Sequence, residues 1–358
     1  MNRTLRTLLI GLAAFFLASE LYAENRTYPC YRLAKTPLID GEVTGDGAWD
    51  NIPSATGFFA LRSNYVVAKK QTSFKMMHDG EAIYIGIHCV EPNVDLLVTK
   101  AQDNDVNIWQ DDSVEIFIFP QGAKKYIQFM ISAAGKRWNG IGEPGSQPIA
   151  LSNWQAATVR GQDYWEVEIK IPFSVLGKKP ADGEKWTGNV CRNVMTPGSM
   201  AGDEHGDRFS SWAGMEYGFH EPERFAAFVF YNKPLPAGET QNIERQLTAQ
   251  VTGLITDEIK QKALPLKEKI DRILLSLFNL KTIGEELEES EDLKKEVNLI
   301  LSEGEAIKKE YEATGDSSLS EISALRELLD KSLILLKRLD GIKYNLLLER
   351  LFSSTDQR

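Results

Sequence analysis

The sequence predicts a β-sandwich followed by an all-α region, and three observations predict it. Up to residue 232, short segments rich in β-branched and aromatic residues alternate with Gly, Pro, Asn and Asp, as is typical of an immunoglobulin-like or jelly-roll-type sandwich. All seven tryptophans and all three cysteines precede residue 213. After "YNKPLPAGET" (231–240), apolar residues recur three and four positions apart, which predicts amphipathic helices in a bundle or coiled coil.

Residues 1–23 have the pattern of a secretory signal peptide. Arg3 and Arg6 precede an apolar run, and Ala23 is a small residue suited to cleavage. The run is shorter than the roughly 20 residues that span a bilayer, and no later segment is long and apolar enough to anchor the chain. We therefore expect a soluble bacterial protein, cleaved near Ala23 and secreted or periplasmic, with no membrane span.

The change in composition sets the expected domains. We assign residues 24–232 to the sandwich, the proline-bearing stretch 233–240 to a linker and 241–358 to a helical domain. The net charge of −10 makes nucleic-acid binding unfavourable. Nothing in the helical domain suggests catalysis, and its leucine-rich stripes predict a core, self-association or contact with a protein partner.

Local patterns predict particular elements in both halves. The segment "YWEVEIKIPF" (164–173) places Val167 and Ile169 on one face of a strand and Glu166 and Glu168 on the other. In the helical half we expect about four helices, with breaks at Pro265, at Gly304 and at 313–318, where Ser318 and Glu321 have the spacing of a capping box.

The cysteines leave two interpretations open. Cys89 and Cys191 lie on predicted core strands of an exported domain, so either they form a disulfide or both are buried thiols. Cys30 lies near the start of the mature chain, where we expect a flexible segment.

The stretch "NIWQDDSVEIFIFP" (107–120) places an aromatic residue and three acids before an apolar strand. Asp111 and Glu115 share a strand face but lie about 13 Å apart at roughly 3.3 Å per residue. This separation exceeds the roughly 5 to 9.5 Å between the paired acids of a glycosidase. The chain also lacks a G-x-S-x-G nucleophile motif, the usual zinc-ligand spacings and C-x-x-C-H, so we expect no enzyme.

Calcium is left open by a second acidic stretch, "IDGEVTGDGAWD" (39–50). Asp40, Glu42, Asp46 and Asp50 supply oxygen ligands among glycines, as calcium prefers. The alternative is a turn in which aspartates hydrogen-bond nearby backbone amides.

A ligand platform is the remaining interpretation of 107–120. An aromatic ring such as Trp109 can stack on the C–H face of a sugar, while Glu115 and the adjacent carboxylates take its hydroxyls. The ligand expected from this chemistry is an oligo- or polysaccharide.

The first half resembles the family-9 carbohydrate-binding modules and the allied DOMON domains over nearly all of residues 36–232. The resemblance is carried, in order, by "PLIDGEVTGDGAWDNI", "HDGEAIYIGIHCVEP", "NIWQDDSVEIFIFP", "YIQFMISAAG", "YWEVEIKIPFSVLG", "WTGNVCRNV" and "SSWAGMEYGFHEPERFAAFVF". It implies a β-sandwich in which two aromatic rings enclose a terminal sugar and a glutamate binds its hydroxyls. These positions fall on Trp109, Phe219 and Glu115, and the family's arginine falls on Met130.

The same resemblance supplies two alternatives. Some relatives bind haem, for which Met130 with His88 or His220 would be the ligands, and the sandwich could also be a purely structural assembly module. If sugar binding needs a substitute for the family's second tryptophan or its arginine, Tyr217 and Arg192 are the residues we expect to supply it.

Overall fold

The computed structural model describes residues 26–63, 65–142, 147–148, 153–197, 208–278, 291–315 and 319–353. The predicted signal peptide and Ser318 lie outside the described residues. The chain divides into two compact units, Met1–Leu254 and Ile255–Arg358. No helix in the described ranges is long and apolar enough to cross a membrane.

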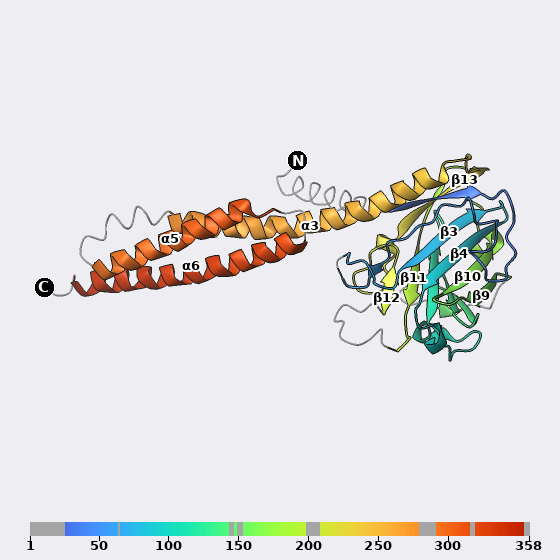
Figure 1. The fold of residues 1–358 in the computed structure, drawn as a ribbon, viewed down its shortest axis with the longest axis horizontal. Helices are drawn as coiled ribbons and strands as arrows, with labels where there is room; N and C mark the ends of the chain where they lie inside the picture. The colour runs from blue at the N-terminus through green and yellow to red at the C-terminus, as the bar shows by residue number, and fades with distance from the viewer. Residues whose placement is uncertain are drawn as a thin grey trace, which may run out of the picture. The chain divides into compact units, whose positions relative to one another are not determined.

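The first unit is the predicted β-sandwich (Figure 1). Its long hydrogen-bonded path runs in the order β8-β7-β6-β5-β11-β13-β1-β3-β4-β10-β9, and β12 pairs with β11 and with β2. The strands are β1 Thr27–Arg32, β2 Phe59–Ala60, β3 Thr72–His78, β4 Ala82–Val90, β5 Ser113–Phe119, β6 Ile127–Ser132, β7 Arg137–Ile141, β8 Gln147–Pro148, β9 Gln155–Arg160, β10 Tyr164–Pro172, β11 Lys185–Asn193, β12 Phe209–Ser211 and β13 Ala226–Pro234. Short helices connect them: η1 Val94–Leu96, η2 Val106–Gln110, α2 Phe173–Leu176 and η3 Pro222–Arg224.

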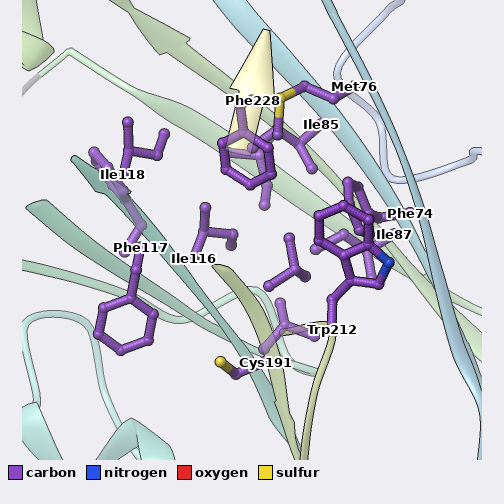
Figure 2. Packing of buried hydrophobic residues seen from close by; sticks show 14 of the residues in the cluster. Phe74, Met76, Ile85, Ile87, Ile116, Phe117, Ile118, Cys191, Trp212 and Phe228 are labelled. Atoms are coloured by element: carbon purple, nitrogen blue, oxygen red, sulfur yellow. The ribbon is translucent and has the colours of Figure 1, made fainter. Parts of the chain in front are cut away.

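Strand β1 joins the two layers of the sandwich. It pairs in parallel along β13 but meets β3 only at Tyr31 and Arg32, whereas the other strand pairs are antiparallel. Side chains of both layers pack into one core, in which Phe74 and Ile85 of β3 and β4 meet Ile116 and Phe228 of β5 and β13 (Figure 2). A core of this extent explains why the aromatic and β-branched segments of the sequence form strands.

Strand β10 shows the expected alternation, but its second face is also covered. Val167 and Ile169 are buried in the core, and Glu166 and Glu168 are buried as well. The loop that contains Asp40 and Gly41 covers this second face. Glu168 Oε2 accepts hydrogen bonds of 2.9 Å from the amides of both residues. The glutamates therefore hold a loop rather than face water.

The domain boundary differs from the expected linker 233–240. Strand β13 continues to Pro234, and helix α3 (Thr240–Phe278) begins inside the first unit. Ile243 and Leu247 of α3 belong to the sandwich core, and the Gln250 side chain forms hydrogen bonds of 2.7 and 3.1 Å with the backbone of Thr27. The first turns of α3 are therefore part of the sandwich unit, and the boundary follows Leu254.

The second unit contains the rest of α3 with α5 (Glu291–Ala313) and α6 (Leu319–Ser353). The predicted break at 313–318 lies between α5 and α6, but α3 continues through Pro265 and α5 through Gly304. Buried residues on both sides of Pro265 keep α3 packed. At Gly304, an added Cβ would lie 3.6 Å from Leu277 Cδ1, an ordinary van der Waals contact, so the packing of α5 does not depend on glycine at this position.

Of the two interpretations of Cys89 and Cys191, the structure shows the second, because both are free, buried thiols. Cys89 lies on β4 and Cys191 on β11, in opposite layers of the sandwich. Cys30 is also buried, on β1 in the core rather than in a flexible segment. All three cysteines act as small apolar core residues.

Candidate ligand pocket

The two aspartates of the acidic stretch hold backbone loops. Asp111 accepts hydrogen bonds of 2.9 Å from the amides of Lys100 and Ala101. Asp112 accepts from the amides of Val98, at 2.8 Å, and Met195, at 3.0 Å. Their carboxylates are thus used inside the protein, and the expectation that all the acids near Trp109 bind a ligand is wrong for these two.

Trp109 is held at the surface by its neighbour. It lies on η2, where Ile108 is fully buried against Ala101, Met130 and Trp138. Trp109 itself is 41% exposed, whereas each of the other six tryptophans is 2% exposed or less. A large part of this indole is therefore accessible to a ligand.

Glu115 lies on β5. Its side chain is on the opposite face of the strand from the core residues Val114 and Ile116. Its side chain is 4% exposed and accepts hydrogen bonds from Gln128 Nε2 at 2.6 Å and from Asn193 Nδ2 at 2.8 Å. Burial raises the pKa of Glu115, and the two amide hydrogen bonds act in the opposite direction. The neighbouring strands β6 and β11 thus fix the orientation of this carboxylate.

The loop before η3 carries Tyr217 and Phe219, and several hydrogen bonds hold its backbone in place. Glu221 is 8% exposed and accepts hydrogen bonds from the amides of Glu216, Tyr217 and Gly218. Arg62 donates from Nε and Nη2 to the Tyr217 carbonyl, at 3.0 and 2.8 Å. Arg62 has a positive φ of 61°, a conformation that costs a non-glycine residue energy and is often found at binding sites.

These elements surround a pocket of about 380 Å³, a size within the usual range for small-molecule sites. Its wall is largely apolar, and two of its polar side chains, Gln128 and Asn193, donate hydrogen bonds to Glu115. The lining residues are Leu61, Arg62, Val106, Trp109, Glu115, Gln128, Met130, Trp138, Asn193, Phe209, Tyr217, Gly218, Phe219 and His220.

The sequence matches the family model described as carbohydrate family 9 binding domain-like over residues 39–230, more than half of the chain. The chain belongs to this family. The match covers the strands that build the pocket and the loop that holds Tyr217.

Solved structures include similar domains. A putative carbohydrate-binding protein from Bacteroides uniformis is 19% identical, with a TM-score of 0.46, over 57% of this chain and 99% of its own. A family 9 carbohydrate-binding module from Caldicellulosiruptor kristjanssonii in complex with glucose is 19% identical, with a TM-score of 0.42, over 59% and 100%. The module from that organism in complex with cellotriose is 19% identical, with a TM-score of 0.41, over 59% and 97%. No curated protein sequence matches the chain.

In this family 9 domain, the three predicted site residues line one pocket. Trp109, Glu115 and Phe219 come from η2, β5 and the loop before η3, and the fold brings them together. Phe219 is only 7% exposed and packs edge-on against Phe209, with ring centroids 6.2 Å apart. Tyr217, in contrast, is 70% exposed in the same loop. Tyr217 therefore offers more accessible aromatic surface than Phe219, the residue that the family resemblance placed there.

Arg192 does not compensate for the family's missing arginine. It is fully buried, and its Nη2 lies 3.5 Å from Glu91 Oε2, outside the pocket lining. Gln128 and Asn193 are pocket residues that sequence reasoning missed. They could have been found from their positions on the strands that pair with β5, because side chains on the same face of adjacent strands contact one another.

Of the residues considered for haem, Met130 and His220 line the same pocket, whereas His88 does not. Met130 is 2% exposed, packs with Trp138 and lines the pocket. His88 is on β4, separated from β6 in the strand order by β5, β11, β13, β1 and β3, and its Nδ1 lies 2.8 Å from Glu166. His220 lines the pocket, but its Nδ1 lies 2.7 Å from the Tyr126 hydroxyl.

The acidic loop considered for calcium forms turns. Asp46 Oδ1 accepts a hydrogen bond of 2.9 Å from the Ala48 amide, and Asp40 Oδ1 accepts one of 3.0 Å from the Glu42 amide. These are the short-range bonds of the turn alternative. Within the described ranges, no three His, Cys, Asp or Glu side chains are grouped to hold a metal ion.

Proposed function

We propose that this protein is exported and binds a carbohydrate non-covalently in the pocket that contains Trp109 and Glu115. The observation that carries the proposal is the convergence of Trp109, Glu115 and Phe219 from separate parts of the sequence onto one pocket. The family description and the sugar complexes of two similar modules support the same ligand class.

Stacking is the first part of the proposed binding mode. The exposed indole of Trp109 offers an apolar face to the C–H groups of a pyranose ring, and Tyr217 offers a second aromatic face. The bonds from Glu221 and Arg62 to the backbone around Tyr217 hold this loop in place before a ligand arrives. A pre-positioned loop lowers the entropy cost of binding.

Polar contacts are the second part. Glu115 is held by two amides that leave lone pairs of its carboxylate for sugar hydroxyls, and such charge-assisted hydrogen bonds are about twice as strong as neutral ones. Trp138 Nε1 is buried without a partner among the described residues and is a donor on the same pocket wall.

Binding without catalysis fits the distribution of acids. Among the described residues that line the pocket, Glu115 is the one carboxylate, whereas glycoside hydrolysis generally uses a pair of acids. Asp111 and Asp112, the nearest acids in the sequence, are engaged by backbone amides. The pocket therefore supplies recognition rather than acid–base chemistry.

A glycan array probed with the mature chain tests the proposal, followed by calorimetry with the glycans that bind. We expect retention of at least one glycan class, and weaker binding by Tyr217→Ala. Leu38→Ala is a matched control, because Leu38 is 71% exposed and does not line the pocket. A folded protein that binds no glycan would overturn the proposal, and fractionation of the native host would test export.

A further inference from the structure

Glu115 is a buried carboxylate whose hydrogen-bond partners are both neutral. Its oxygens accept from the amides of Gln128 and Asn193, and no Lys, Arg or His in the described part of the chain forms an ion pair with it. Met130 occupies the directly opposite position on β6 and supplies only a thioether. A buried charge without a counter-ion is costly, so this site favours a ligand that brings a positive charge.

Two basic side chains, Arg62 and His220, line the pocket, and neither forms an ion pair with Glu115 in the described part of the chain. The Arg62 guanidinium donates two hydrogen bonds to the Tyr217 carbonyl. His220 lies 2.7 Å from the Tyr126 hydroxyl through Nδ1, and burial lowers its pKa, which favours the neutral ring. The charge of Glu115 is therefore left for the ligand to compensate.

The groups around Glu115 add a second acceptor and a donor. Asn193 is 1% exposed, and its Nδ2 donates to Ser113 Oγ at 3.0 Å and to Glu115. Its Oδ1 is buried with no partner among the described residues, as is Trp138 Nε1. A ligand that satisfies both must carry donors as well as an acceptor, as a sugar does.

The exposed aromatic residues of the pocket suit a cation too. Trp109 and Tyr217 have free ring surface, and an ammonium group near the face of such a ring is attracted by its quadrupole. A neutral hydroxyl donates one hydrogen bond and leaves the carboxylate charge uncompensated, whereas an ammonium has three donors and a charge.

We infer that the pocket selects a sugar with a protonated amino group, a hexosamine whose amine is free. This inference rests on the proposed carbohydrate binding and names its ligand class. Glu115 takes the ammonium group, Asn193 Oδ1 accepts a further N–H or O–H, and Trp109 stacks on the ring.

Three oligosaccharides with the same β-1,4 backbone test the inference, because they differ only at C2. Oligomers of glucosamine, glucose and N-acetylglucosamine carry an amine, a hydroxyl and a neutral acetamide. Calorimetry with the full mature chain would be run at about pH 6, below the roughly 7.7–8.0 pKa of a reference α-amino group. We expect the glucosamine oligomer to bind at least about tenfold more tightly than the other two.

The Glu115→Gln variant should lose this preference and bind the glucosamine and glucose oligomers about equally. Glu223→Gln is the matched control, because Glu223 is exposed and does not line the pocket. In the unmodified protein, glucosamine binding should also weaken as the pH rises through the pKa of the sugar amine, whereas glucose binding should not. Burial raises the pKa of the Cys191 thiol, which lies opposite Glu115, well above its usual value.

The outcomes separate the inference from the proposed function. Equal binding of the three oligomers, or tighter binding of the glucose oligomer, would overturn the amine preference and leave carbohydrate binding intact. Failure of the folded protein to bind any of the three or any arrayed glycan would overturn both. The comparison of ligands on the unmodified protein remains decisive if Glu115→Gln does not fold.

Discussion

Replacing Trp109 with alanine separates a ligand platform from an ordinary core residue. Trp109 is 41% exposed, and an aromatic side chain presents about 150–250 Å², so about 100 Å² of this residue is free. If a sugar covers about half of that area, the lost stabilisation at about 25 cal/mol per Å² is about 1.3 kcal/mol, or about tenfold in affinity. Trp109→Ala should therefore raise the dissociation constant about tenfold.

The same change should affect stability little. Ile108, the neighbour of Trp109, makes the buried contacts of η2, so the expected loss in the free energy of unfolding is below about 1 kcal/mol. This corresponds to a fall in melting temperature of no more than about 4 °C for a unit of this size. Trp165→Ala is the buried control, fully inside the core, and should cost about 3–5 kcal/mol.

Tryptophan fluorescence can follow the melting of the sandwich unit alone, because all seven tryptophans precede residue 213. Calorimetry on the same samples gives the affinity. The reasoning is refuted if Trp109→Ala lowers the melting temperature as much as Trp165→Ala does, or if it leaves the affinity for the bound glycan unchanged.

Three further predictions follow from the described contacts. A fragment that ends at residue 254 should be more stable in urea than one that ends at 232 by about 3–6 kcal/mol, because the shorter one loses buried Ile243 and Leu247; equal midpoints would contradict the boundary. A thiol reagent should modify no cysteine in the native chain and three after unfolding, whereas one reactive thiol would indicate a disulfide. Glu221→Ala should weaken glycan binding several-fold, because three backbone amides lose their acceptor, a net loss of about 1 kcal/mol or more for such bonds. Glu223→Ala should have no such effect, and identical affinities for the two variants would argue against a role for the loop in binding.

Local patterns allowed much of the fold to be predicted. The alternation in 164–173 and the apolar spacing after residue 240 depend on neighbours within one strand or helix, and both elements form. Trp109 and Glu115 could also be singled out, because an aromatic and a carboxylate that flank a strand start are visible in the sequence. Tyr217 was named only as a possible substitute, since nothing in its segment indicates that it stays exposed.

The sequence by itself therefore determined the two halves of the chain, the type of each long element and the residues with ligand-binding chemistry. Tertiary structure decided which acids can bind a ligand. The carboxylates of Asp111, Asp112 and Glu168 accept hydrogen bonds from backbone amides of other segments of the chain. It also decided that Glu115 accepts a hydrogen bond from Asn193 and, among the described residues, forms no ion pair. The physical reason is that strand identity depends on local side-chain periodicity, whereas hydrogen-bond partners and burial depend on which distant strands and loops pack together.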